Sequence, residues 1–297
     1  MTQAGPRSFK CDARKIPQEP AARRLRGPRL PENQGFLATR GDTGRRPGAL
    51  TIVSGITNSE ALGLVDPFGG AANASSYVPR EATERVLGDL EQALLGGAAC
   101  ALLVGDAGLG KSLLLRVLEQ RLERECATVY LPYPALPLGS LCSWACSALG
   151  LVAGEDPAGR LLEFARRGRE GRSGLVLLID DIGDVPDATL VGLAGLIELS
   201  GGSLRLAGCV DPEGAYAVAD LWLDGAAMRL LEPMSLEDCR QYVHTLLRRA
   251  NAPAPVLRAF GDCELARLHA AGEGVPSRMN SEAVHILRHL PEPQLSS

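Results

Sequence analysis

The stretch Gly105-Asp106-Ala107-Gly108-Leu109-Gly110-Lys111-Ser112 decides which fold this chain of 297 residues is expected to have. It matches the pattern GxxxxGK[ST], follows an apolar run at 100–104 and precedes a segment with the apolar period of a helix. Its glycines let the loop turn backbone N–H groups toward phosphate oxygens, and the next helix adds positive potential at its first turn. The pattern predicts a bound nucleoside triphosphate, ATP, held by Gly105, Asp106, Ala107, Gly108, Leu109, Gly110, Lys111, Ser112 and Leu113.

Two side chains of this loop have predicted roles at the phosphates. Lys111 is expected to reach the β and γ phosphates, and the Ser112 hydroxyl is expected to bind Mg²⁺. The alternative interpretation is a chance glycine turn before a helix. Lysine usage argues against chance, because Lys111 is the only lysine after Lys15, whereas nineteen arginines follow residue 50. A phosphate site needs a compact ammonium on a flexible stem at this position.

A second motif, Leu175-Val176-Leu177-Leu178-Ile179-Asp180-Asp181, follows about 70 residues after the loop. An apolar strand that ends in two carboxylates is a Walker B pattern. Asp180 is expected to bind Mg²⁺ through water, and Asp181 to polarise the attacking water. The alternative is an acidic strand end that caps a turn before Gly183.

The periodicity beyond residue 80 alternates short apolar runs with amphipathic segments, which is typical of a parallel sheet covered by helices. This predicts an α/β P-loop fold with five strands, at 100–104, 128–131, 175–179, 204–207 and 228–231. Helices are predicted at 80–95, 111–125, 138–149, 158–168 and 187–199.

After Glu232-Pro233 the strand pattern stops, and Ser235 opens a helix as its cap residue. Helices at 235–250, 255–270 and 277–290 predict a small all-helical domain. The expected organisation is a basic tail at 1–62, a nucleotide-binding core at 63–233, a helical lid at 234–291 and a C-terminal tail at 292–297.

Charge is uneven along the chain. Residues 1–50 hold eleven Lys or Arg against four Asp or Glu, and the rest of the chain has 20 basic against 31 acidic residues, a net charge of −11. The basic segment is rich in Pro and Gly and lacks an apolar period, so we expect it to be disordered. It is interpreted as a solvated leader or a start codon assigned too early; the alternative is a segment that binds nucleic acid or an acidic membrane.

No secretory signal and no apolar run of about 18–20 residues is present, so a cytoplasmic protein without direct membrane insertion is expected. The cysteines form no CxxC pair, which argues against a zinc site or a disulfide framework and predicts small buried apolar side chains. Cys142 with Cys146, and His285 with His289, lie one helical turn apart, but neither pair has a third metal ligand nearby.

Residues 66–291 resemble an AAA+ ATPase of the general secretion pathway protein A (ExeA-type) family, which is related to origin-recognition and transposition-helper ATPases. The segment Asp66-Pro67-Phe68 with Tyr77 and Arg80 resembles the part of that family that lies along the adenine. Leu206-Ala207-Gly208-Cys209 resembles the sensor 1 strand, and Leu231-Glu232-Pro233-Met234-Ser235 the junction into the lid. Gly274-Val275-Pro276-Ser277-Arg278-Met279-Asn280 resembles the sensor 2 turn. The resemblance implies that Tyr77 contacts the nucleotide and that Arg278 acts as a catalytic residue beside Lys111, Asp180 and Asp181.

The chain departs from that family at several positions. Asp181 stands where the family has glutamate, Cys209 where it has a polar amide, and Arg278 falls one position late because Ser277 intervenes. No arginine finger occurs at 223–227, and Arg229 is the nearest candidate. An arginine finger is worth on the order of 10³ to 10⁵ in rate, so the departures predict slow hydrolysis and an ATP-dependent switch that closes the lid through Arg278.

Three functions follow from these observations. The resemblance implies an ATPase or ATP-gated switch that serves a secretion or cell-envelope assembly through a protein partner. The alternative is a DNA-associated regulator of the transposition-helper or origin-binding kind that forms a homo-oligomer on DNA; the net charge beyond residue 50 argues against a broad DNA footprint. A third interpretation is a degenerate fold that holds ATP as a structural ligand.

Overall fold

The computed structural model describes residues 67–69, 73–132, 135–168, 174–222 and 226–290, all of which lie within the unit Ser54–Ser297. The predicted tails at 1–62 and 292–297 lie outside the described residues, as do Asp66 and residues 223–225.

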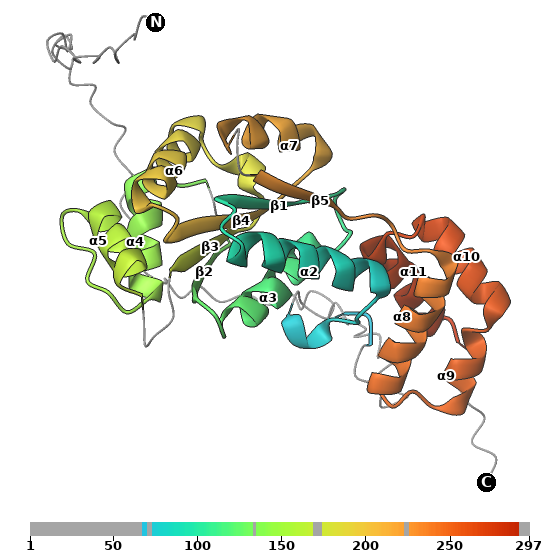
Figure 1. The fold of residues 1–297 in the computed structure, drawn as a ribbon. Coiled ribbons are helices and arrows are strands. Elements are labelled where there is room, and N and C mark those ends of the chain that lie inside the picture. Colours follow the sequence, from blue (N-terminus) through green and yellow to red (C-terminus); the bar gives the residue numbers. More distant parts are fainter. Residues whose placement is uncertain (1–66, 70–72, 133–134, 169–173, 223–225, 291–297) are drawn as a thin grey trace, which may run out of the picture. The chain divides into compact units, whose positions relative to one another are not determined.

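A five-stranded parallel sheet forms the centre of the described region, as predicted (Figure 1). Its order is β2-β3-β4-β1-β5, so strand β1, which leads into the glycine loop, lies between β4 and β5. The carboxyl ends of β1, β3 and β4 therefore meet at one edge of the sheet, where open α/β folds bind their ligands. The strands are β1 (Cys100–Val104), β2 (Ala127–Leu131), β3 (Leu175–Ile179), β4 (Leu204–Val210) and β5 (Ala226–Leu230).

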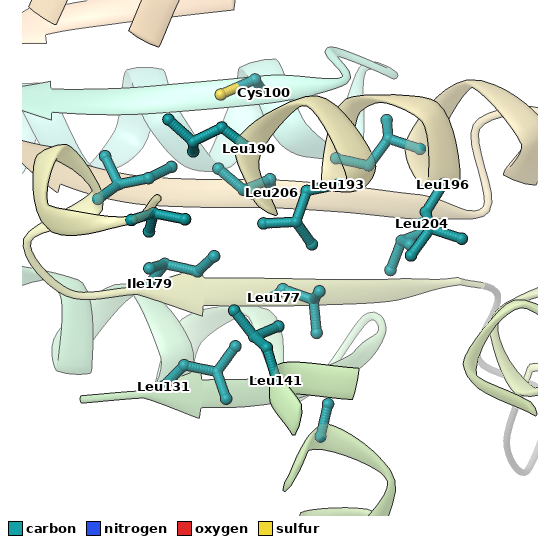
Figure 2. Close-up of a cluster of buried hydrophobic side chains, with 14 of the residues drawn as sticks. Cys100, Leu131, Leu141, Leu177, Ile179, Leu190, Leu193, Leu196, Leu204 and Leu206 are labelled. Carbon is teal, nitrogen blue, oxygen red and sulfur yellow. The ribbon is translucent and has the colours of Figure 1, made fainter. Parts of the chain in front are cut away.

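Alternate residues of each strand face opposite sides of the sheet, and each side has its own buried cluster. Leu177 and Leu206 pack with Leu141 and Leu193 in the larger cluster, which Figure 2 shows between the strands and their covering helices. The helices that contribute to this cluster are α4 (Leu138–Ala148), α5 (Pro157–Arg167), α6 (Asp187–Ser200) and α7 (Pro212–Ala219).

The opposite face of the sheet is covered by α2 (Glu81–Leu95) and α3 (Lys111–Leu122). Leu90 of α2 and Leu118 of α3 are nearly inaccessible and pack on Leu103 and Leu178 of the strands. Burial of a leucine side chain contributes about 1.5–3 kcal/mol, so this layer fixes the start of α3 against the sheet.

The C-terminal region is helical, with its own buried cluster around Phe260 and Leu265. Phe68, which precedes the sheet in sequence, belongs to this cluster, and its ring centroid lies 5.8 Å from that of Phe260. Ser235 caps the first helix with its side chain, as predicted. The helices are α8 (Leu236–Arg249), α9 (Ala254–Ala259), α10 (Asp262–Gly272) and α11 (Pro276–Arg288).

The predicted boundaries were wrong at several places. The single helix predicted at 255–270 is two helices, because Phe260 leaves the helical conformation (φ −97°, ψ 49°) and Gly261 caps α10 in extended geometry. Strand β4 runs three residues past the predicted 207. Residues Gly208 to Val210 all pair with β1, and Gly208 also pairs with β3. Helix α3 ends at Leu122, not at 125, and α7 was not predicted.

Most of the described cysteines are buried small side chains, as predicted, but Cys263 is exposed. Cys142 and Cys146 belong to the larger buried cluster. The rings of His285 and His289 have centroids 4.2 Å apart, and His289 Nδ1 also contacts the carbonyl of His285 at 2.8 Å. Neither pair belongs to a set of three metal-ligating side chains among the residues that the structure describes.

Candidate nucleotide site

The glycine loop connects β1 to α3 in a conformation that its glycines make possible. Gly108 and Gly110 have φ values of 85° and 95°, a region that is strained for residues with a Cβ atom. Leu109 between them is buried in the cluster under α2 and α3 and anchors the loop. The N–H of Gly105 donates to the Val210 carbonyl at 3.2 Å, which ties the start of the loop to the end of β4.

A cleft of about 790 Å³ opens beside this loop. Most of the residues predicted to bind the nucleotide line it, but Gly105, Asp106 and Leu109 are not among its lining residues and contribute backbone contacts and packing instead. The lining residues at the loop end are Ala107, Gly108, Gly110, Lys111, Ser112, Leu113, Asp181, Gly183, Asp184, Val210, Asp211, Glu213 and Gly214. The other end is lined by Pro67, Phe68, Ser76, Tyr242, Leu246, Pro276, Ser277 and Asn280.

Lys111 reaches into this cleft from the first turn of α3, although only 7% of the residue is exposed. Its Nζ donates to the carbonyls of Gly105 at 2.7 Å and Asp106 at 3.3 Å, and to Asp211 Oδ1 at 2.5 Å. A nearly buried ammonium needs such partners, because its desolvation is costly. The ammonium is therefore held at the loop end of the cleft by two backbone carbonyls and one carboxylate.

Ser112 and Asp180 meet at the carboxyl end of β3. The Ser112 hydroxyl donates to Asp180 Oδ1 at 3.0 Å, and Tyr130 Oη donates to Asp180 Oδ2 at 2.6 Å. Burial, then the hydrogen bond to the Asp180 carboxylate, raise the pKa of Tyr130, while the Arg116 guanidinium lies 3.3 Å over the Tyr130 ring. A serine hydroxyl beside a carboxylate is the oxygen-donor set that Mg²⁺ prefers, so these residues fit that ion.

Asp181 lines the cleft from a left-handed backbone conformation with φ 45°. Aspartate tolerates this region better than most residues. Burial raises the pKa of the Asp181 carboxyl, and the charge of Asp180 raises it further. Asp181 therefore lies where it could orient a water molecule in the cleft.

Cys209, which ends the segment that resembles the sensor 1 strand, is not among the residues that line the cleft. Its thiol is inaccessible, donates to Asp180 Oδ1 at 2.7 Å and accepts the N–H of Asp181 at 3.3 Å. Burial, followed by the hydrogen bond to Asp180, raises the pKa of this thiol. Asp211, which directly follows β4, lines the cleft, and it was not among the predicted site residues. The signal for it was an acidic residue before Pro212, a cap followed by a first-turn proline.

Tyr77 was predicted to contact the nucleotide, but its hydroxyl lies elsewhere. Tyr77 Oη is 2.7 Å from Thr83 Oγ1 and donates to Glu84 Oε1 at 2.9 Å. Tyr77 does not line the cleft, whereas Ser76 next to it does. Arg80 is also buried outside the lining, and burial lowers its pKa.

Neither the predicted sensor 2 arginine nor the nearest finger candidate is among the residues that line the cleft. Arg278 is ion-paired with Glu273 and its side chain is 58% exposed, while Arg229 Nε donates to Asp89 on α2 at 2.7 Å. Ser277, directly after Pro276, instead contacts the loop: its N–H donates to the Gly108 carbonyl at 3.2 Å. A Cβ atom on Gly108 would lie 2.1 Å from Ser277 Oγ and 3.1 Å from Ser277 Cβ, so any larger residue would have to displace Ser277.

Charge in the cleft is unbalanced. Among its described lining residues, Lys111 is the only Lys or Arg, whereas Asp181, Asp184, Asp211 and Glu213 carry carboxylates. Ligand binding here depends on how these charges are offset.

Comparisons with known proteins agree with the fold. Residues 94–211 match a family model described as an AAA domain. The comparison with curated proteins found no match. No helix in the described part of the chain has the length and apolar character that a membrane crossing requires.

Solved structures with the same architecture share little sequence with this chain. Cdc6p from Pyrobaculum aerophilum has 16% identity and a TM-score of 0.54, with 75% of this chain and 64% of that chain covered. The replication initiator DnaA bound to AMPPCP and single-stranded DNA has 12% identity and a TM-score of 0.50, with 73% and 65% covered. The RuvB Holliday junction branch migration motor of Thermotoga maritima has 16% identity and a TM-score of 0.48, with 73% and 64% covered.

The chain thus spans less than two thirds of each of these structures. The sheet order, the glycine loop between β1 and α3, and the family match at 94–211 give one conclusion: this chain has the P-loop AAA+ ATPase fold, with a helical C-terminal region.

Proposed function

We propose that this chain binds ATP with Mg²⁺ in the cleft beside the glycine loop and acts as an ATP-gated switch with slow hydrolysis. The observation that carries the proposal is the contact between Ser277 and Gly108, in which the start of α11 is hydrogen-bonded to the loop that would hold the phosphates. A ligand that moves the loop must then change this contact. Residues 63–233 act as the nucleotide-binding core in this proposal, and residues 234–291 act as the lid.

Each group at the loop has a defined part in binding. The loop N–H groups and Lys111 would hold the phosphates, and Ser112 with Asp180 would hold Mg²⁺, which offsets phosphate charge when it is bound. Tyr130 keeps the Asp180 carboxylate in place by occupying its Oδ2. The end of the cleft at Phe68, Tyr242 and Leu246 offers apolar and aromatic surface for the base.

Slow hydrolysis follows from the side chains that face the cleft. Charge develops on the phosphoryl oxygens in the transition state, and arginine is the usual group that stabilises it. Arg278 is paired with Glu273, and Ser277 takes the place next to the lid proline. Asp181 is the residue proposed to orient the attacking water, with a side chain one methylene shorter than glutamate.

The switch is proposed to serve a protein assembly of the secretion or cell-envelope kind, as the ExeA-type resemblance implies. The alternative is DNA, which the similar DnaA structure binds together with AMPPCP. The basic charge of residues 1–50 favours this alternative, while the net charge of −11 beyond residue 50 opposes it. Salt-dependent DNA binding that is lost on deletion of residues 1–50 would support DNA. Nucleotide-dependent capture of envelope proteins would support the first output.

A pair of glycine variants tests the switch. Gly108→Ala and Gly110→Ala both place a Cβ atom at positive φ, but only the Cβ of Gly108 collides with Ser277, since nothing lies within 4 Å of the one at Gly110. Hydrogen exchange of residues 276–288 should slow when Mg²⁺ and ATP are added to the wild type. We expect Gly108→Ala to raise exchange there and to abolish the ATP response, and Gly110→Ala to keep exchange of the unliganded α11 at the wild-type level.

Two outcomes would contradict the proposal. The first is an exchange rate at 276–288 that does not respond to ATP although ATP binds. The second is unaided turnover by the wild type of about 10 s⁻¹, the median rate for enzymes, because no arginine is among the described residues that line the cleft.

A further inference from the structure

Asp211 forms an ion pair with the Lys111 ammonium, the group that is proposed to bind the nucleotide phosphates. It follows β4 and precedes α7 (Pro212–Ala219), and its Oδ1 lies 2.5 Å from Lys111 Nζ. The two residues are 100 positions apart in sequence, so the fold, not local sequence, brings them together. Phosphate oxygens that bind Lys111 must compete with this carboxylate.

The surroundings strengthen this competition. Asp181, Asp184 and Glu213 also line the cleft, so a polyphosphate that enters without a cation meets four carboxylates and one ammonium among the described lining residues. Like charges that share one cleft repel, so each carboxylate opposes the approach of an unscreened phosphate. A divalent cation bound to the phosphates reduces it.

The Asp211 side chain is nevertheless free to leave Lys111. It is 60% exposed, whereas the Lys111 side chain is 8% exposed, so the carboxylate can turn into water while the ammonium stays. Its role as the N-cap of α7 uses backbone geometry, because no side-chain cap hydrogen bond is present. Release of Asp211 therefore leaves α7 intact.

We propose that Asp211 makes nucleotide binding conditional on a divalent cation: it holds Lys111 until a nucleotide arrives whose charge is already offset by the metal. This inference rests on the proposed function, because it concerns the same cleft and the same ligand. It assigns Asp211 as a positioning residue for Lys111 and gives it a part in choosing the metal complex of ATP over free ATP.

The test measures binding of a methylanthraniloyl-ATP probe to the full chain, once with excess Mg²⁺ and once with a chelator. The variants are Asp211→Asn and, as matched control, Glu213→Gln, which removes one negative charge from the same cleft without removing a contact to Lys111. Asp211→Asn should tighten binding in chelator by roughly tenfold, the worth of one charge-assisted hydrogen bond. Glu213→Gln should change it by less than about twofold, as expected of an exposed charge for which the described residues provide no ion pair.

Equal gains in both variants would show that only the overall field matters, and would overturn the role of Asp211. The ratio of probe affinities with Mg²⁺ and with chelator is the second criterion. If Asp211→Asn has the same ratio as wild type, the role of Asp211 is overturned as well. Asp211→Ser, which keeps a good cap residue and also lacks the charge, should repeat the result. Wild type that fails to bind the probe even with Mg²⁺ would overturn the proposed function itself, a result that the same titration separates from the others.

Discussion

Lys111 illustrates how a single side chain links the sequence pattern to the cleft. Its ammonium is held by two loop carbonyls and by Asp211, so it is already placed where phosphate oxygens would bind. Placement before binding reduces the entropy cost of forming the site. The sole lysine beyond residue 15 is thus the first residue of α3, directly after the glycine loop.

Glu84 carries a prediction about pH. It accepts from Arg121 at 2.8 and 2.7 Å and from Tyr77 Oη at 2.9 Å, which joins α2, α3 and the segment before them. The hydrogen bonds from Arg121 lower the pKa of Glu84 below its ordinary 4.5. A lowered folded-state pKa stabilises the fold above the ordinary value, and that stabilisation disappears as the pH falls through the folded-state pKa.

Glu84→Gln should therefore lower the free energy of unfolding near neutral pH by about 0.5–1 kcal/mol, after allowance for solvent screening of this partly exposed pair. The difference from wild type should vanish in acid below the folded-state pKa. Glu81→Gln, whose Arg85 pair is far more exposed, is the control and should change little. Urea denaturation across pH checks this. A deficit that persists unchanged in acid would mean that packing, not charge, explains it.

Helices α9 and α10 show why element boundaries matter in the C-terminal region. Phe260 ends α9, is inaccessible, and contacts Phe68 from the segment before the sheet. Because Phe68 also lines the cleft, the same aromatic pair supports both the helical cluster and the cleft wall.

Phe260→Ala should destabilise the helical region by about 3–5 kcal/mol, the cost of removing a buried aromatic ring. Leu257→Ala in α9 is the control, because Leu257 is 39% exposed, and it should cost less than about 1 kcal/mol. Denaturant titration followed by circular dichroism measures both. Equal losses of stability in the two variants would contradict the claim that the buried Phe260 ring stabilises the helical region.

Local patterns predicted the parts of the fold that depend on local sequence. The apolar run at 100–104 and the glycine loop fix β1 and the start of α3, and the run at 175–179 fixes β3, because each signal is complete within a few residues. The pattern at 255–270 was misread because Phe260 is apolar and in phase for a helix, although tertiary packing turns the chain there. Helix α7 was not predicted; it has only eight residues and includes Gly214, a poor helix former.

Long-range placement could not be predicted from the sequence. Neither the local motifs nor the resemblance indicates which side chain at the end of β4 lines the cleft, so Asp211 was not among the predicted site residues. The direction of Arg278 depends on Glu273, whose φ of 52° turns the chain before α11. The Tyr77 hydroxyl is hydrogen-bonded to Thr83 and Glu84 of α2 and does not line the cleft. These contacts depend on how the segment before α2 packs on that helix.

At the scale of the molecule, the cleft is lined by two parts of the chain, the glycine loop with the strand ends and the C-terminal helical region. The loop and the segments after β3 and β4 line one wall, and the helical region supplies Ser277, Tyr242 and Asn280 to the other wall. Tyr242 Oη donates to Asn280 Oδ1 at 3.1 Å, which joins α8 to α11 at that wall. A ligand that fills the cleft would contact both parts, so its binding energy could fix their relative position.

The most direct test of the account is calorimetric titration of ATP with Mg²⁺ into wild type, Lys111→Ala and Arg85→Ala. Arg85 is an exposed cation paired only within α2 among its described contacts, so it controls for loss of one positive charge. We predict that the wild type binds, that Arg85→Ala binds equally well, and that Lys111→Ala loses about hundredfold or more in affinity. Wild type without measurable binding, or Lys111→Ala with wild-type affinity, would contradict the assignment of this cleft as an ATP site.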